Sequence, residues 1–251
     1  PLGATVQIVT DDMPLLVESV LALLSRLDVS IGTLIHPVLS VRRTAEGDLE
    51  HLTPDGTGAD TAESWMHLQL RGAIDDATLD EIERGLRRVL SDVRQVAHDS
   101  DEMGARQRED ADLLARLADD PPAPYTAAEL AETADFLRWL DNGHFLLLGY
   151  RRYDFVTDGS GRVRAVPVAG TGRGVLRTDS PGDDPLELPA EVGPDRRPLL
   201  VLTQGALPAT VDRSVYPYFV SVARLDAGHV VGEDRFLGVL TVTALHDNIL
   251  D

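Results

Sequence analysis

The order of strand-like and helix-like patterns in the first part of the chain is the feature that most restricts the fold. Apolar and polar residues alternate in Val6–Val9 and in Trp65–Arg71, as they do in strands with one buried face. Apolar residues recur at helical spacing from about 14 to 27 and from about 75 to 90. A β-rich segment covers residues 30–43. The resulting order, β-α-β-β-α, predicts a ferredoxin-like domain with two helices on one face of an antiparallel sheet.

Two segments of this first domain have a less definite pattern. Val93–Ala97 is either a last strand or a continuation of the preceding helix. Leu52–Glu63 is rich in Gly, Asp and Thr and is predicted to be a mobile loop, and Glu46–Asp48 before it is a turn signal. The first domain is expected to cover residues 1–98.

The rest of the chain predicts a helical linker and a second α+β domain. Asp99–Asp119 is highly charged, as in a surface helix, and Pro121–Pro124 ends it. Thr126–Glu129 has the pattern of a capping box and begins a further helix. The linker is expected at 99–125 and a mainly antiparallel domain at 126–251. Its strands are expected at His144–Phe155, Arg162–Pro167, Leu199–Thr203, Val215–Arg224 and Val230–Thr243, with a long Gly-, Pro- and Asp-rich loop at Val168–Arg197.

The composition excludes several classes of function. All 23 basic residues of the 251-residue chain are arginine, and there is no cysteine. Without lysine there is no Schiff base and no phosphate-loop lysine; without cysteine there is no disulfide, thiolate nucleophile or cysteine-ligated metal. The 42 acidic residues give a net charge of −19, which argues against nucleic acid or an anionic membrane as a partner. No apolar stretch is long enough to span a bilayer, and the start without methionine is interpreted as that of a fragment.

A candidate binding site lies between the first predicted strand and the first predicted helix. Backbone amides at a helix start carry a positive partial charge and suit a carboxylate ligand. The competing interpretation is that Asp11 or Asp12 simply caps the helix. An aspartate at this place also repels an anionic ligand unless an ammonium group of the ligand meets it. The candidate effector-binding residues are Thr10, Asp11, Asp12, Met13, Pro14 and Leu15.

The other motifs do not assemble into a recognisable site. Gly170–Gly174 has G-x-G-x-G spacing with no helix after it, so it is interpreted as a flexible turn. The seven histidines lack metal-ligand spacing, and Ser160 lacks the strand-turn-helix context of a nucleophile. We therefore expect no catalytic, cofactor-binding or metal-binding residues in this segment. Five aromatic residues either line a pocket or pack in the core: Tyr150, Tyr153, Tyr216, Tyr218 and Phe219.

Several strings resemble a known family in the expected order. They are Ile8–Val17, Ile35–Val38, Glu63–His67, Trp139–Tyr150 and Pro167–Gly172. Together they resemble the N-terminal region of the large bacterial NAD-specific glutamate dehydrogenases. The resemblance implies an ACT-like regulatory domain followed by a PAS-like domain, with the catalytic domain and its NAD site far downstream in the same polypeptide. ACT domains bind amino acids near an Asp-x-Pro-Gly-Leu stretch, and here Leu15 stands where the glycine belongs.

Three functions are weighed on this basis. The first is a non-catalytic regulatory and assembly segment of a cytoplasmic NAD-dependent glutamate dehydrogenase, with self-association through the ACT-like domain. The second is a sensor that binds an amino-acid effector, either at the first helix start or among the aromatic residues of the second domain. The third, a stand-alone hydrolase, is disfavoured because no nucleophile and base can be identified.

Overall fold

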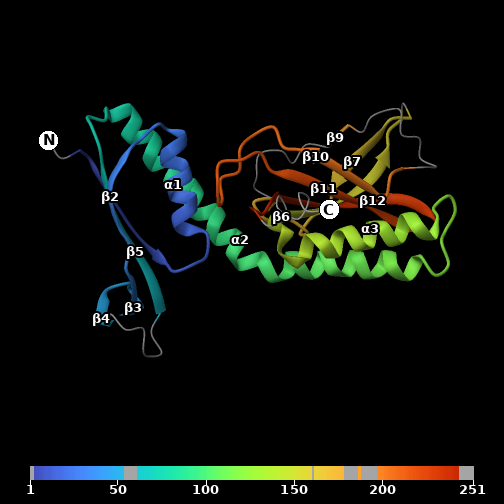
Figure 1. Cartoon of the computed structure of the whole chain (residues 1–251), viewed down its shortest axis with the longest axis horizontal. Coiled ribbons are helices and arrows are strands. Elements are labelled where there is room, and N and C mark those ends of the chain that lie inside the picture. Colours follow the sequence, from blue (N-terminus) through green and yellow to red (C-terminus); the bar gives the residue numbers. More distant parts are fainter. Residues whose placement is uncertain (1–2, 54–60, 160, 178–185, 188–196, 243–251) are drawn as a thin grey trace. The chain divides into compact units, whose positions relative to one another are not determined.

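The structure, a computed structural model, forms two compact units. It describes residues 3–53, 61–159, 161–177, 186–187 and 197–242. The first unit comprises Pro1–Arg94 together with Thr210–Ser214, and the second comprises Gln95–Ala209 and Val215–Asp251. Both units combine helices with an antiparallel sheet, which confirms the predicted α+β class (Figure 1).

The first unit has a five-stranded antiparallel sheet around a central strand, β5. Strand β5 pairs with β1 along one edge and with β2 and β3 along the other, and β4 pairs with β3. The elements are β1 (Thr5–Asp11), α1 (Leu16–Arg26), β2 (Ile31–Ile35), β3 (Val38–Arg43), β4 (Leu49–Thr53) and β5 (Thr61–Leu70). Helix α2 (Asp76–Leu117) contributes its residues 76–94 to this unit.

The core of the first unit follows directly from the two periodicities in the sequence. Side chains at alternate positions of the strands point to one face, and helical residues three and four apart form one stripe. Met66, Leu68 and Leu70 of β5 are at most 3% exposed and lie on that face. They pack with a buried stripe from the helices: Leu16, Val20, Leu23 and Leu24 of α1, and Ile82, Leu86 and Val89 of α2. The observed order is β-α-β-β-β-β-α, so the predicted order β-α-β-β-α has too few strands: segment 30–43 forms two strands, β2 and β3, and β4 is additional. The predicted arrangement of two helices against one antiparallel sheet is present.

The structure resolves two ambiguous segments of this unit. Val93–Ala97 continues α2 and adds no strand. Both ends of the predicted loop 52–63 lie in strands, because Leu52 and Thr53 end β4 and residues 61–63 begin β5, and residues 54–60 lie outside the described residues. Strand β4 was not predicted. It forms because the turn signal at Glu46–Asp48 folds the chain back, with Gly47 at φ 95°, so that β4 pairs with β3.

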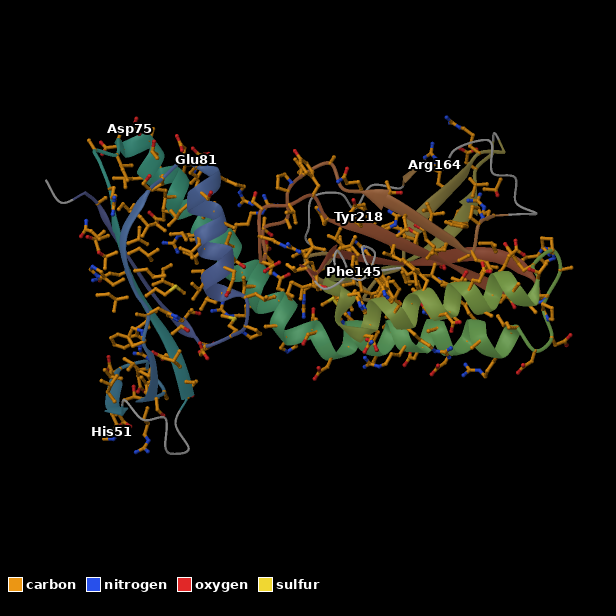
Figure 2. The ribbon with its side chains drawn as sticks, viewed as in Figure 1. His51, Asp75, Glu81, Phe145, Arg164 and Tyr218 are labelled. Atoms are coloured by element: carbon orange, nitrogen blue, oxygen red, sulfur yellow. The ribbon has the colours of Figure 1, made fainter. Side chains whose placement is uncertain are left out.

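The second unit is a seven-stranded antiparallel sheet with helices on one face (Figure 1). The strand order is β10-β11-β12-β6-β7-β9, and β8 pairs with β6. The strands are β6 (Phe145–Thr157), β7 (Val163–Pro167), β8 (Arg173–Gly174), β9 (Leu186–Glu187), β10 (Leu200–Gln204), β11 (Tyr218–Asp226) and β12 (His229–Leu240). The helices are residues 95–117 of α2, α3 (Ala127–Trp139) and a short π-helical turn, η1 (Leu140–His144). Figure 2 shows their side chains filling the space against the sheet.

The predicted strands of the second half are confirmed to within a few residues. The capping box is also confirmed: the Thr126 hydroxyl accepts from the Glu129 amide, and the Glu129 carboxylate accepts from the Thr126 amide. Inside the long predicted loop, β8 and β9 are short strands that the sequence did not indicate. Residues 99–117 form part of α2 and lie in the second unit, and the predicted domain limits at 98 and 125 remain predictions.

Candidate functional site

The candidate effector loop, residues 10–15, leads from β1 into α1. Leu15 is the residue before the helix and has a left-handed backbone, φ 66° and ψ 5°, with no side-chain capping bond. A glycine adopts this conformation without strain, whereas a leucine does so at a cost. Leu15 therefore has a backbone conformation that favours glycine, and it adds a half-buried side chain at this position.

The interpretation that Asp11 or Asp12 caps α1 is wrong, because the chain continues through Met13 and Pro14 before the helix begins. Asp12 is instead fastened to the sheet. Its backbone amide donates to the Ala62 carbonyl at 2.9 Å, and its Oδ1 accepts from the Ser64 hydroxyl at 2.5 Å.

Ser64 also lies 2.9 Å from His36 Nε2. Because the Ser64 proton goes to Asp12, the Ser64 oxygen accepts from the imidazole N–H. In a nucleophilic site the imidazole removes the serine proton, and here the order is reversed. The Asp12, Ser64 and His36 side chains thus form a structural link, and Ser64 is fully buried.

Two further contacts hold the loop and the first turn of α1. Arg94 Nη2 donates to the buried Thr10 hydroxyl at 3.0 Å. The Ser19 hydroxyl donates to the Leu15 carbonyl at 2.5 Å and accepts from the Asp212 amide at 2.8 Å. Segment 210–214 of the first unit therefore bonds to the start of α1.

The charges around the helix start decide which ligands suit it. Asp11 and Asp12 are exposed, Glu18 lies in the first turn of α1, and Arg94 is the basic side chain that contacts the loop. Three carboxylates oppose a simple anion, even at the positive end of a helix. A zwitterion, whose ammonium group meets the carboxylates, fits this loop better.

The glycine-rich loop of the second unit is firmly held, so the prediction of a flexible turn is wrong. Arg173 donates to both carboxylate oxygens of Glu102, at 2.6 and 2.8 Å. The Gly174 amide donates to Asp99 Oδ2 at 2.7 Å, and Arg177 pairs with the same carboxylate. These bonds hold the loop against α2, and Gly174 allows close packing, since a Cβ at this position would lie 2.2 Å from the Leu148 carbonyl oxygen.

A buried polar network lies between α2 and the sheet of the second unit. Asp234 is 1% exposed and accepts from the Tyr150 hydroxyl at 2.5 Å and from Arg152 Nε and Nη2 at 2.9 and 3.1 Å. Burial, together with the bond to Asp234, raises the pKa of Tyr150, and the bond to Asp234 raises the pKa of Arg152. Burial and the nearby charge of Asp234 raise the pKa of Asp110 to about 8.

The aromatic residues do not line one pocket. Tyr150 packs on Phe236, at 5.1 Å between ring centroids, and Tyr153 lies under the Arg235 guanidinium at 4.6 Å. Positions 150 and 153 point to opposite faces of the strand, which explains the separation. Tyr216 is half exposed. Ser160, which the sequence analysis rejected as a nucleophile, lies outside the described residues.

Sequence reasoning missed Ser64, Asp99, Asp110 and Asp234, and a signal for three of them was present. Ser64 occupies an inward position of β5, and Asp99 and Asp110 fall on the stripe that Val96, Met103 and Leu114 mark along α2. A polar residue at an apolar position of a periodic pattern indicates a buried polar contact. Among the described residues, His, Asp and Glu side chains form no group of three that could hold a metal ion.

Comparison with known proteins gives a consistent assignment. Residues 3–86 match the family model described as glutamate dehydrogenase, ACT1 domain. The NAD-specific glutamate dehydrogenase of Mycobacterium tuberculosis is 33% identical over 251 residues, which is 99% of this chain and 14% of that protein. This chain is a relative of the NAD-specific glutamate dehydrogenases. The resemblance inferred from the sequence strings is thereby confirmed.

Two further glutamate dehydrogenases agree. Those of Pseudomonas aeruginosa and Halomonas elongata, both described as NAD-specific, are 34% and 32% identical over 98% and 97% of this chain. The chain spans only 14–15% of the length of the three relatives. The candidate loop 10–15 falls inside the ACT1 match. No helix in the described part of the chain is both long and apolar enough to cross a membrane.

Proposed function

We propose that the chain is a regulatory and assembly segment of a cytoplasmic NAD-dependent glutamate dehydrogenase, with no catalytic activity by itself. In this proposal the longer protein converts L-glutamate, NAD and water to 2-oxoglutarate, ammonia and NADH. The catalytic domain and the NAD site belong to other parts of the same polypeptide. The observation that carries the proposal is the similarity over 97–99% of this chain to a small part of three NAD-specific glutamate dehydrogenases, together with the ACT1 match.

The polar contacts support a role without catalysis. The contact between Ser64 and His36, which lie outside the candidate loop but bond to it through Asp12, has its hydrogen bonds in the wrong direction for a nucleophile. The carboxylates of Asp99 and Asp234 already form ion pairs, with Arg177 and Arg152 respectively. Among the described residues, we find no nucleophile, base and oxyanion donor gathered around one open space.

The outward face of the first unit's sheet supports self-association. Val9 and Ile35 are 51% and 56% exposed, although both lie in strands. Val9 is paired with Trp65 and Ile35 with His67, so these side chains share the face opposite the helices. Contiguous apolar side chains on a sheet face favour a protein partner. In the proposal that partner is a second copy of this domain.

Sedimentation velocity over a series of concentrations tests this assembly. The chain is expected to sediment faster as its concentration rises, and Ile35→Arg should remove that dependence. Leu207→Arg is the matched control, because Leu207 is 75% exposed and belongs to the second unit. A monomer at every concentration would contradict assembly through this face, and glutamate-dependent reduction of NAD by this chain would contradict the non-catalytic role.

The alternative function is an amino-acid sensor at loop 10–15. Leu15 makes no side-chain cap, and Asp12 bonds to Ser64, so neither side chain occupies the amides at the start of α1. Calorimetric titration with free amino acids tests it. Binding that is lost in Asp12→Ala and kept in Asp48→Ala, an exposed aspartate of the β3–β4 turn, would favour the sensor. The absence of heat, together with concentration-dependent sedimentation, would favour assembly.

The second unit is proposed to be PAS-like, as the resemblance implies. Its support is the antiparallel sheet with α2 and α3 on one face. In the regulatory proposal, this unit holds the segment between the ACT-like domain and the catalytic part of the polypeptide.

A further inference from the structure

A partly enclosed cavity lies between the last turns of α2 and the sheet of the second unit. Its volume is about 140 Å³. At about 30 Å³ for each water molecule, this is roughly the space of five waters or of one short aliphatic molecule. Leu113, Leu114 and Leu117 of α2 form one wall, and Val222 of β11 contributes to the other. The cavity is thus apolar over much of its lining.

One polar group of this lining has no partner. Oδ2 of Asp110 is buried and makes no hydrogen bond with any described residue. Leaving a buried carboxylate oxygen without a donor is unfavourable, so such an atom calls for an explanation.

The other charged groups around the cavity are balanced. Asp234 of β12 is paired with Arg152 of β6 and also accepts from Tyr150. Arg224 of β11 is paired with Asp154 at 2.9 Å. Among the described residues, Asp110 is therefore the carboxylate of the cavity lining that no arginine contacts in an ion pair, although the charges of Arg152 and Arg106 lie near enough to favour its ionisation.

We propose that this cavity binds a small aliphatic molecule through a primary ammonium group, which donates to Asp110. The ammonium supplies both the missing hydrogen bond and the missing charge, and the leucine wall receives the aliphatic part. An anion is disfavoured by Asp110 and Asp234, and a neutral alcohol leaves the charge of Asp110 uncompensated. The ammonium belongs either to a simple alkylamine or to an aliphatic amino acid, and the two differ by a carboxylate.

Proton linkage gives this site a specific signature. The pKa of Asp110 lies at about 8, because burial and Asp234 oppose ionisation. Arg152 and, on α2, Arg106 favour ionisation, whereas Glu109 opposes it. The ammonium binds the ionised carboxylate, so at neutral pH binding releases a proton from Asp110. The apparent affinity should therefore increase about tenfold for each unit by which the pH is raised toward 8, and it should level off above pH 8.

Isothermal titration of the 251-residue chain with butylammonium at about pH 9 tests the proposal. Butan-1-ol and butyrate are the uncharged and anionic controls, and valine distinguishes an amino acid from a simple amine. Saturable binding of butylammonium, about tenfold or more tighter than that of either control, is expected. Repeating the titration at pH 7 in two buffers of different ionisation enthalpy should show the released proton.

Two pairs of variants connect the binding to the cavity. Asp110→Asn should abolish it, whereas Asp112→Asn, an exposed carboxylate on the same helix that pairs with Arg138, should not. Leu113→Trp, which keeps Asp110 and fills the cavity, should also abolish it, with Arg116→Trp as the control on an exposed position. Circular dichroism confirms that each variant is folded.

Three results would overturn the proposal: no saturable binding of butylammonium or valine at about pH 9, an affinity independent of pH, or full binding by folded Asp110→Asn. The test is separate from that of the proposed function. An effector bound at loop 10–15 is lost in Asp12→Ala and kept in Asp110→Asn, and failure of either site leaves the sedimentation result unchanged.

Discussion

The Arg177 guanidinium forms a bidentate ion pair with the Asp99 carboxylate: Nε donates to Oδ2 at 2.8 Å, and Nη2 donates to Oδ1. Asp99 is 3% exposed and lies on α2, 78 positions earlier in the chain. Burial opposes its ionisation, but bonds from His98, the Gly174 amide and Arg177 outweigh that effect and hold the pKa of Asp99 below its usual range. The pair fastens the glycine-rich loop to the helix.

Asp99→Ala is expected to lower the free energy of unfolding by about 2–3 kcal/mol, because it leaves the buried Gly174 amide and Arg177 without their acceptor. Urea denaturation at neutral pH measures this loss. Asp101→Ala, at an exposed position two residues further along α2, should change stability by less than about 0.5 kcal/mol. Equal effects of the two substitutions would contradict a structural role for Asp99.

The same pair has a consequence at acid pH. A carboxylate whose pKa is lowered by folding contributes stability above its ordinary pKa of about 4, and the contribution disappears as the pH falls through its folded pKa. The difference between the wild type and Asp99→Ala should therefore be full at neutral pH and shrink below about pH 4. Denaturation curves at several pH values measure it.

Gly174→Ala is expected to destabilise the second unit by more than about 3 kcal/mol. Gly174 has φ 57°, and an added Cβ would lie 2.2 Å from the Leu148 carbonyl oxygen of β6. Gly170→Ala is the matched control: its φ is 76°, but nothing lies within 4 Å of the added Cβ. That variant should lose about 1 kcal/mol, which thermal unfolding can distinguish.

Asp110 should make the wild type less stable as the pH rises. The folded carboxyl, with a pKa of about 8, holds its proton where the unfolded one has lost it, so stability falls between about pH 4 and pH 8. The slope from this group is at most about 1.4 kcal/mol for each pH unit. Asp110→Asn should remove this part of the dependence, and its stability relative to the wild type should increase up to about pH 8. An unchanged difference across that range would show that Asp110 titrates normally.

Ser64→Ala is expected to cost about 1–2 kcal/mol, because Asp12 loses a donor and His36 loses an acceptor at a fully buried position. Thr61→Ala, at an exposed position of the same strand, should have a much smaller effect. Chemical denaturation of the two variants makes the comparison. If Ser64→Ala also altered amino-acid binding at loop 10–15, the Asp12 contact would be a positioning contact for that loop.

The periodicities in the sequence were sufficient for the class of fold. The alternation in Trp65–Arg71 and the stripe that includes Leu16, Val20 and Leu24 predicted which faces are buried, because strand and helix geometry place these side chains together regardless of neighbours. The capping box at Thr126 was equally predictable, since both of its partners lie within one helical turn.

The sequence alone did not determine the contacts whose partners are distant in the chain. Asp99 and Arg177 are 78 positions apart, and Tyr150 and Asp234 are 84 apart. The G-x-G-x-G string predicted a flexible turn because glycines are conformationally permissive, and only the approach of β6 makes Gly174 tightly packed. Likewise, the sequence shows Asp110 as one charge on a charged helix. The fold removes water from one of its oxygens and brings it close to Asp234, and these two effects decide its chemistry.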